Sequence, residues 1–344
     1  MTGQGGRYER MTFKKHSAGI LGTGFYVPEK ILTNDDLSKI VDTSDEWITE
    51  RTGIKERRIA ADDEATSDLS MRAAEAALKD AGVTPEELDL IIVCTLTSDR
   101  IIPSTACMLQ TRLGAKKAAA FDLSAACSGF AYGLSVATQF IETGAYKKAL
   151  VIGAETLSKY INWEDRNTCV LFGDGAGAAV VGEVEDGYGI LSFDLGSDGS
   201  GGDAIQIPSS GSRLPVSKET IDQRLNLIHM NGRDVFKFAV KAMGNTVKHA
   251  LEKIGMSQEK IDWLVPHQAN IRIIQSAAKR LNMPMEKVIL TVQKYGNMSA
   301  ACIPIALAEA AAEKRFKKGD IVALSGFGAG LTWASCIIRW SKED

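Results

Sequence analysis

Three side chains in this sequence have types and positions that suit covalent chemistry. Cys127 follows the strand-like run AAAFDLS and precedes an amphipathic segment, so its thiol should lie at the first turn of a helix. The positive end of the helix dipole and the unpaired backbone N–H groups there favour the thiolate, which is the nucleophilic form of cysteine. A buried structural cysteine would fit the same context, so both interpretations stand for Cys127 alone.

His267 and Asn297 are the candidate partners of this thiol. His267 lies in DWLVPHQANIRI at the end of an apolar strand, where α/β folds place ligands, whereas the other three histidines lie in polar or helical contexts. Asn297 lies in the turn of KYGN before an apolar helix. A structural histidine and a helix-capping asparagine would also explain these two positions.

Two glycine-rich runs need separate interpretations. GFGAG (Gly326–Gly330) follows a strand and could bring backbone N–H groups close to a substrate oxygen, or it could be a tight turn between strands. GDGAGA (Gly173–Ala178) precedes a strand instead of opening a helix. That order excludes a dinucleotide-binding loop.

Short β-branched runs alternate with alanine-rich amphipathic stretches along the chain. We expect strands at Leu90–Thr95, Ala149–Gly153, Gly177–Val181, Trp263–Val265 and Ile321–Ser325. We expect helices at Thr66–Ala81, Gly129–Thr143, Asp234–Ile254, Ile271–Leu281 and Ala300–Lys314. This alternation predicts an α/β fold with a largely parallel sheet in each half.

The two halves of the chain resemble each other. AALKDAGVTPEELDLII (Ala76–Ile92) aligns without a gap on HALEKIGMSQEKIDWLV (His249–Val265), and each segment is typical of a helix, a Gly cap, a turn and a buried strand. A looser repeat places the turn Ala126–Gly129 in register with the turn near Asn297–Ala300. If the halves pack about a pseudo-twofold axis, both turns converge on one site.

The repeat sets the expected domain organisation. Residues 1–15 are polar and are expected to form a disordered N-terminal extension. Residues 16–184 form the half with the nucleophile, and residues 185–344 comprise connecting loops and the half with His267 and Asn297. The stretch before Met230 is rich in Gly and Ser, so we expect surface loops there.

Composition excludes several classes of protein. The 344 residues include 40 Lys and Arg against 43 Asp and Glu, a net charge of −3, so no basic excess indicates a nucleic-acid partner. No apolar run approaches the roughly 18 residues of a membrane span, and the N-terminus lacks the apolar core of a signal peptide. The six scattered cysteines form neither a disulfide framework nor a zinc-ligand pattern. We therefore expect no metal site and a reducing cytoplasmic location.

Taken together and in order, the motifs resemble the β-ketoacyl-acyl-carrier-protein synthase III family, the initiating condensing enzymes of bacterial type II fatty-acid synthesis. The resemblance runs from about Ala18 to Trp340. It rests on Asp42–Ala60 (DTSDEWITERTGIKERRIA), Ala125–Phe130 (AACSGF), Phe172–Val180 (FGDGAGAAV), Val265–Ile273 (VPHQANIRI), Tyr295–Ala301 (YGNMSAA) and Gly326–Trp333 (GFGAGLTW).

The resemblance implies a thiolase-like fold, in which duplicated α/β halves form a five-layer α-β-α-β-α architecture. It implies a catalytic triad of Cys127, His267 and Asn297, and an oxyanion hole made by the backbone N–H groups of Cys127 and Ala329. Many relatives have Gly at the latter position, but Ala supplies the same N–H. A Cys-His-Asn set favours this branch and the plant-type polyketide synthases over elongating synthases and thiolases.

Family resemblance also implies three binding regions. The CoA site would comprise Thr43, Trp47, Arg51, Arg166, Gly232 and Asn270, with adenine between Trp47 and Arg166. The docking surface for the acidic carrier protein would comprise Lys237, Arg272, Lys279 and Arg280, although a solvated helix face explains these residues as well. The acyl pocket would comprise Ile102, Phe172 and Phe327. Ile102 matches a position that caps the pocket in relatives, often across a dimer interface. Phe at that position favours acetyl primers, so we expect the smaller Ile102 to admit longer or branched ones.

The implied reaction is a decarboxylative Claisen condensation of an acyl-CoA primer with malonyl-acyl-carrier protein through an acyl-cysteine. It needs no cofactor, since acyl-CoA is a substrate, and the resemblance implies a homodimer. Three alternatives remain at this point: a thioester hydrolase, a polyketide- or quinolone-pathway synthase of the same fold, and a catalytically silent binding subunit.

Overall fold

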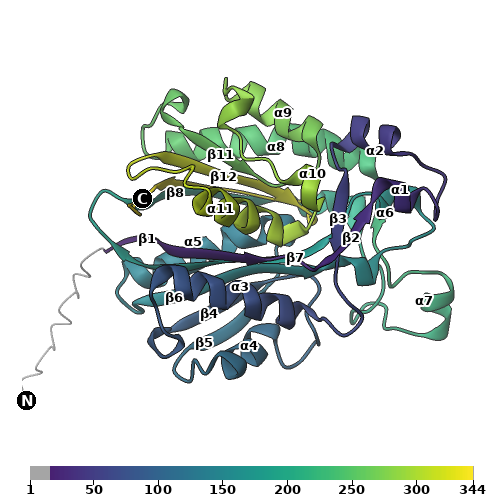
Figure 1. Cartoon of the computed structure of the whole chain (residues 1–344), viewed down its shortest axis with the longest axis horizontal. Helices are drawn as coiled ribbons and strands as arrows, with labels where there is room; N and C mark the ends of the chain where they lie inside the picture. Colours follow the sequence, from purple (N-terminus) through teal and green to yellow (C-terminus); the bar gives the residue numbers. More distant parts are fainter. Residues whose placement is uncertain (1–15, 344) are drawn as a thin grey trace, which may run out of the picture.

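Two mixed β-sheets form the framework of the chain. The computed structural model describes residues 16–343, so the extension predicted for residues 1–15 lies outside the described residues (Figure 1). The first sheet has the order β1-β7-β6-β4-β5, made of β1 (Ser17–Tyr26), β7 (Asp174–Val184), β6 (Lys148–Thr156), β4 (Leu90–Cys94) and β5 (Ala119–Leu123). The second has the order β11-β12-β13-β8, made of β11 (Trp263–Pro266), β12 (Ile321–Gly328), β13 (Thr332–Arg339) and β8 (Gly189–Ser197).

Helices cover both faces of each sheet and produce five layers. Helices α3 (Thr66–Ala81) and α4 (Thr105–Leu113) pack on the outer face of the first sheet, and α8 (Gly232–Glu252) packs on the second together with α9 (Ile271–Arg280). Between the sheets lie α5 (Gly129–Glu142) and α11 (Cys302–Ala312), which contact strands of both. Figure 1 shows this order, with α8 and α9 on one side and α3 and α4 on the other. The predicted five-layer architecture is confirmed.

Shorter elements surround one end of the sheets. They are β2 (Lys30–Thr33), α1 (Asn34–Leu37), α2 (Asp45–Thr52), β3 (Glu56–Ile59), α6 (Arg166–Cys169), β9 (Ile205–Gln206), α7 (Lys218–Asp222), β10 (His229–Met230) and α10 (Val292–Tyr295). Strand β2 pairs with β3, and β9 pairs with β10. Within residues 16–343, no helix combines the length and apolarity that crossing a bilayer demands.

The two sheets repeat one topology. In the first, β1 and β7 are antiparallel, β7 and β6 are antiparallel, and β6, β4 and β5 run parallel. In the second, β8, β13, β12 and β11 follow the same sequence of pairings. The counterpart of β5 is reduced to an isolated parallel bridge between Val288 and Leu264. The duplication inferred from the sequence is therefore present at the level of strand order.

Two expectations need correction. The sheets are mixed and not largely parallel, because two of the four pairings in the first sheet and two of the three in the second are antiparallel. The stretch 185–230 is not only loops, because β8 lies within it and forms the edge strand of the second sheet. Gly, Ser and Asp residues in β8 obscure its strand character, and half-buried positions there tolerate them because an edge strand has only one neighbouring strand in its sheet.

Each half has a short 3₁₀ turn directly before its central helix, and this turn packs against a strand of the other half. In the first half, η2 (Ala126–Ser128) leads into α5, and in the second, η7 (Ser299–Ala301) leads into α11. The residue that opens each turn has a left-handed backbone, with φ of 49° at Ala126 and 46° at Ser299. η2 packs against β12 of the second half, while η7 packs against β6 of the first. This exchange brings the two turns into contact with each other.

Glycines in the receiving strands make the exchange possible. A Cβ on Gly153 of β6 would lie 2.2 Å from the carbonyl oxygen of Ala300, and a Cβ on Gly328 of β12 would lie 2.6 Å from the backbone nitrogen of Cys127. Neither backbone atom can move independently of its turn. The approach of the halves therefore depends on strand positions without side chains.

Replacement of Gly153 by alanine tests this contact. Because the new methyl group would overlap the Ala300 carbonyl, we expect Gly153→Ala to lower the free energy of unfolding by about 2–3 kcal/mol, as overpacking does. Denaturant unfolding followed by circular dichroism measures the change. Gly199→Ala is the matched control, since nothing lies within 4 Å of its added Cβ. Equal stability of both variants would contradict the tight approach.

Candidate active site

One large cavity collects the predicted catalytic residues. It has a volume of about 780 Å³ and is lined from both halves of the chain. Cys127, His267 and Asn297 all line it, together with Ala329 of the β12–β13 turn. Residues separated by 140 or more positions in the sequence therefore meet in one site, as the duplicated turns predicted.

Cys127 occupies the η2 turn directly before α5, and its side chain is almost fully buried. The expectation that this position favours the thiolate is not what the free structure shows. Burial raises the pKa of the Cys127 thiol to about 12, and the Ser299 hydroxyl and the residue's own backbone N–H offset only part of that effect. The desolvation cost of an anion here exceeds the gain from the helix terminus. Ionisation of this thiol in the free structure therefore has a desolvation cost.

His267 follows β11 and is 1% exposed. Neither ring nitrogen has a hydrogen-bond partner within the described part of the chain, and the edge of the ring contacts Phe327 at 5.4 Å between centroids. Burial lowers the pKa of His267 to about 3, so the imidazole is neutral at physiological pH. A neutral imidazole carries one N–H donor, and an unpaired buried donor beside an open cavity is available to a substrate oxygen.

The side chain of Gln268 fixes the backbone next to His267 through hydrogen bonds. Its Nε2 donates to the carbonyls of Pro266 and Ile289, while its Oε1 accepts from the backbone N–H groups of Thr291 and Val292. The side chain is fully buried, so all four of these bonds are shielded from water. The sequence analysis did not select Gln268, although a lone amide in an otherwise apolar strand end was a signal for it.

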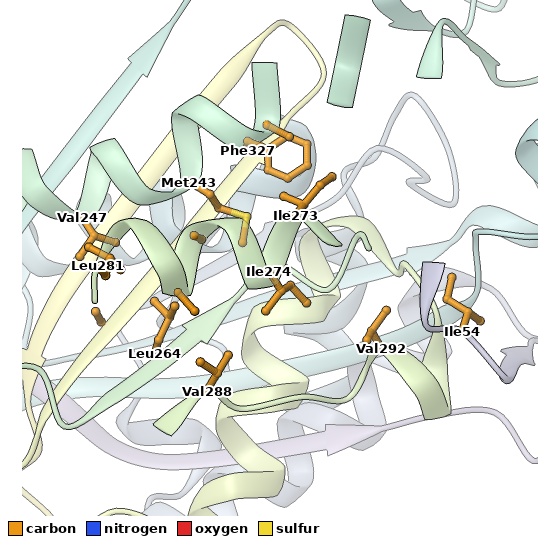
Figure 2. Packing of buried hydrophobic residues seen from close by; sticks show 14 of the residues in the cluster. Ile54, Met243, Val247, Leu264, Ile273, Ile274, Leu281, Val288, Val292 and Phe327 are labelled. Atoms are coloured by element: carbon orange, nitrogen blue, oxygen red, sulfur yellow. The ribbon is translucent and has the colours of Figure 1, made fainter. Parts of the chain in front are cut away.

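The hydrophobic core behind this segment also reaches the cavity. Figure 2 shows side chains of α8, α9 and β11 interleaved, including Met243, Ile274 and Leu264. Ile273 and Phe327 belong to the same cluster and line the cavity. The wall of the site is therefore continuous with a packed core, and it resists displacement for that reason.

Asn297 is fixed at both its backbone and its side chain. Its backbone N–H donates to Leu171 and its carbonyl accepts from Gly173, at 2.9 and 3.0 Å. Its Oδ1 accepts from the backbone N–H of Ser299 at 2.9 Å. Because Oδ1 is used in this way, the Nδ2 group is the end of the amide that faces the cavity. Asn297 thus presents a hydrogen-bond donor, as His267 does.

The GFGAG run comprises the last three residues of β12 and the start of the turn to β13, and it is also part of the site. Thr332 ties this turn to the nucleophile, since its hydroxyl contacts the carbonyls of Ala125 and Ala329 at 3.1 and 3.2 Å. The backbone of Gly328 lies against the backbone N–H of Cys127. Cys127 and Ala329, whose N–H groups were expected to form an oxyanion hole, therefore lie at the same end of the cavity.

Five of the six predicted CoA residues line the same cavity, and three of them (Arg51, Gly232 and Asn270) also line a hollow beside it. Trp47, Arg51, Arg166, Gly232 and Asn270 line the cavity, whereas Thr43 does not. The guanidinium carbons of Arg51 and Arg166 lie 4.5 and 5.1 Å from the centre of the Trp47 ring. A planar ring between Trp47 and Arg166 needs a separation of roughly 7 Å, two van der Waals contacts, so Arg166 must swing away to admit one.

The predicted docking residues separate into two groups. Lys237 and Arg272 line a hollow at the mouth of the cavity, together with Arg51, Asn270 and Arg233, which the sequence analysis did not select. Lys279 is exposed farther along α9. Arg280 packs over Gly244 and donates to Asn245 at 3.1 Å. The structure therefore brings Lys237 and Arg272 together at the cavity mouth, apart from the other two.

The predicted acyl-pocket residues also divide. Phe172 and Phe327 are each 3% exposed and line the cavity near the triad. Ile102 is 82% exposed and lies outside the cavity of its own chain. Its neighbour Ile101 is equally exposed, at 88%. The role of Ile102 as a cap stays a prediction, and it requires a second copy of the chain.

Comparison with known proteins agrees with this geometry. Residues 121–199 match the family described as 3-oxoacyl-[acyl-carrier-protein] synthase III, and residues 251–340 match the C-terminal part of that family. A β-ketoacyl-[acyl-carrier-protein] synthase III of Caldanaerobacter subterraneus is 61% identical over 329 residues, which are 96% of this chain and 99% of that protein.

Solved structures show the same relationship. The 3-oxoacyl-[acyl-carrier-protein] synthase III of Aquifex aeolicus is 50% identical with a TM-score of 0.87, and the match covers 94% of this chain and all of that one. The priming β-ketosynthase of the R1128 polyketide pathway is 34% identical with a TM-score of 0.89, over 99% and 100% of the two chains.

Fold and site together define an acyltransferase of the thiolase-like condensing class. Within that class, the chain belongs to the β-ketoacyl-acyl-carrier-protein synthase III family, since the relatives match it over nearly their whole length. The resemblance inferred from the motifs is confirmed.

The protonation state of His267 is open to direct measurement. Its folded-state pKa of about 3 lies below the ordinary value of about 6.5, so only the unfolded chain takes up this proton as pH falls. We expect the His267 ring signals in NMR spectra of ¹⁵N-histidine-labelled protein to stay constant from pH 8 to pH 5. The stability that His267 contributes is present above about pH 6.5 and declines below it. Comparison with His267→Gln assigns the signals, and a midpoint near 6.5 would contradict the burial argument.

Proposed function

We propose that this chain condenses an acyl-CoA primer with malonyl-acyl-carrier protein, through an acyl group on Cys127. The products are 3-oxoacyl-acyl-carrier protein, CO2 and CoA, so the reaction initiates fatty-acid synthesis and uses no cofactor. The observation that carries the proposal is the pairing of one buried thiol with two neutral donors, His267 and Asn297, at the end of a single cavity. That set suits acyl capture followed by stabilisation of an enolate.

Acyl transfer to Cys127 is the first half of the reaction. The thiolate attacks the thioester carbonyl of acyl-CoA, and the CoA thiolate leaves. The backbone N–H groups of Cys127 and Ala329 hold the oxyanion that forms, because both lie at this end of the cavity. The apolar rings of Phe172 and Phe327 receive the acyl chain.

Decarboxylation of the malonyl thioester is the second half. His267 and Asn297 donate hydrogen bonds to the thioester carbonyl, which becomes an enolate oxygen as CO2 departs. Donors that are fixed in advance are worth about 3–4 kcal/mol each in such a step. Gln268 and the Leu171–Gly173 segment fix them here. The enolate carbon then attacks the acyl-Cys127 carbonyl, and the Cys127 thiolate is released.

The cationic mouth of the cavity suits both substrates. Arg51 and Arg166 flank Trp47, an arrangement that stacks on adenine and meets phosphate once Arg166 moves. Asn270, directly before α9, connects that helix to α2, since its Nδ2 donates to the carbonyl of Arg51 at 2.8 Å. Lys237 and Arg272 face the same opening and suit an acidic carrier protein.

Two features complete the proposal. A homodimer would let the exposed Ile102 cap the acyl pocket of a partner subunit. A cytoplasmic location agrees with the six free cysteines, because thiols persist in reducing compartments. Among the alternatives, a polyketide-priming synthase is the nearest, given the shared fold of the R1128 enzyme at 34% identity. The higher identity, 61%, to a β-ketoacyl-[acyl-carrier-protein] synthase III favours the primary proposal.

The two half-reactions are separable by mutation. Asn297→Ala removes an enolate donor but not the nucleophile, so we expect it to form the acyl-enzyme on acyl-CoA and to release CO2 from malonyl-carrier protein at least 100-fold more slowly. Intact-protein mass spectrometry and ¹⁴CO2 release measure the two steps. Cys127→Ala should show no acyl adduct. Free acid in place of a β-ketoacyl product would indicate a hydrolase, and an unmodified wild type would indicate a silent subunit.

Charge reversal tests the docking surface. Arg272→Glu should raise the apparent KM for malonyl-carrier protein about tenfold and change that for acyl-CoA much less, because the long-range attraction acts on the acidic partner. Lys260→Glu is the control, since Lys260 is an exposed lysine before β11, at the opposite end of that strand from His267. Equal effects of Arg272→Glu on both substrates would contradict carrier-protein docking.

A further inference from the structure

A buried arginine next to the Asn297 turn has no role in the mechanism above. Arg57 lies in β3 and is fully buried, and the partners of its guanidinium in the described part of the chain are neutral oxygen atoms. Burial lowers the pKa of Arg57 to about 10, so the group still carries its charge at neutral pH. Arginine is rarely buried so completely without a carboxylate, because desolvation of the charge is costly. The groups that this guanidinium joins therefore indicate its function.

The guanidinium of Arg57 joins three segments that are far apart in the sequence. Its Nη1 donates to the carbonyl of Leu32 in β2 at 3.0 Å and to Oδ1 of Asn34, the first residue of α1, at 2.9 Å. Its Nη2 donates to the carbonyl of Val170, at the end of α6, at 2.8 Å. A planar group with several fixed N–H donors suits such a junction, because it reaches acceptors in different directions without changing its own geometry.

Val170 leads directly into the segment that holds Asn297. The backbone N–H of Asn297 donates to the carbonyl of Leu171, and the backbone N–H of Gly173 donates to the carbonyl of Asn297. These two bonds form an isolated parallel bridge between Phe172 and Asn297, outside the named strands. An isolated bridge has no neighbouring ladder of bonds to maintain it, so its geometry depends on how firmly residues 170–173 are held.

The stem of Arg57 also packs against both sides of this bridge. A Cβ added to Gly173 would lie 3.0 Å from the Cβ of Arg57, and one added to Gly296 would lie 3.5 Å from the same atom. Gly173 belongs to the bridge, and Gly296 directly precedes Asn297. Arg57 therefore contacts the two chain segments whose separation sets the position of Asn297.

Asn34 anchors the opposite side of the guanidinium. Its Oδ1 accepts from Arg57, while its Nδ2 donates to the carbonyl of Ile54 at 2.7 Å and to Oδ1 of Asp45, the first residue of α2, at 2.8 Å. Asn34 is 1% exposed, so these bonds are shielded from water. A guanidinium that is fixed on this side can fix the chain segment on its other side.

We infer that Arg57 is a positioning residue for Asn297, because its guanidinium and its stem hold residues 170–173, to which the backbone of Asn297 is hydrogen-bonded. Among the described residues, Arg57 does not line the cavity, so it acts on the enolate only through Asn297. A shift of about 1 Å in a donor that must meet developing charge can cost a large part of its effect. Arg57 lies in the Asp42–Ala60 motif, but the sequence analysis assigned it no role.

The experiment compares the two half-reactions in Arg57→Met, each at a saturating concentration of its substrate. Release of ¹⁴CO2 from malonyl-carrier protein should be about tenfold slower, because the enolate donor is displaced. Acylation of Cys127 by acetyl-CoA, followed by quenched intact-mass spectrometry, should change by less than about twofold, since the Cys127 turn rests on β12. Equal slowing of both steps, or no slowing of either, would overturn the inference.

Two further variants keep this comparison decisive. Arg57→Met should fold, because it removes the desolvation cost of a buried charge along with the hydrogen bonds. If it does not, Arg57→Lys takes its place: it keeps the charge but not the planar fork, and should show the same difference between the steps. Leu88→Ala is the control for lost stability, since Leu88 is fully buried before β4, at the opposite end of that strand from the site. It should leave both rate constants per folded molecule unchanged.

The inference rests on the proposed function, and hydrogen exchange separates the two. The backbone N–H groups of Asn297 and Gly173 close the bridge, so we expect both to exchange about tenfold faster in Arg57→Met than in the wild type. Mass spectrometry of short peptides measures this exchange without any substrate. Unchanged exchange at these two groups would contradict the positioning role, whatever the activity. A wild type that releases no CO2 would contradict the proposed function instead, and the exchange comparison would still decide the role of Arg57.

Discussion

The site exists because each half of the chain inserts its turn against a strand of the other half. The nucleophile turn rests on β12 and the Asn297 turn rests on β6, with backbone atoms close enough that the strand positions must be glycine. Such contacts leave no room for adjustment, since backbone cannot rotate away as a side chain can. The positions of Cys127, Asn297 and Ala329 are therefore set by packing between the halves, and the catalytic distances follow from the fold as a whole.

Burial is the second determinant of the chemistry, and it acts differently on each group. Burial lowers the pKa of His267, so its ring is neutral and can donate one hydrogen bond. Burial raises the pKa of the Cys127 thiol. The same dry surroundings strengthen any hydrogen bond to a developing enolate or oxyanion. A site built this way favours charge that appears only during the reaction.

Many of the helices and most of the site residues could be predicted from the sequence. The α3 segment Thr66–Ala81 was predicted with its exact bounds, because its amphipathic pattern ends at a glycine cap. The triad and four of the CoA residues came from short motifs, whereas Arg166 and Gly232 came from the overall family resemblance. The antiparallel outer strands were missed, since small and polar residues in β1 and β8 give no clear alternation. Gln268 was missed because its importance arises from four buried hydrogen bonds to backbone groups, which the motifs do not record.

The η7 turn of the second half is the counterpart of the nucleophile turn, but it has a different residue at the position of the nucleophile. At the place that corresponds to Cys127, the second half carries Ala300, whose carbonyl oxygen presses on Gly153. Alanine at this place provides no nucleophile. The two copies have therefore become specialised: one presents the reactive sulfur, while the other supplies the amide of Asn297. The result is a single asymmetric reaction centre inside a nearly symmetric framework, in which neither half is sufficient alone.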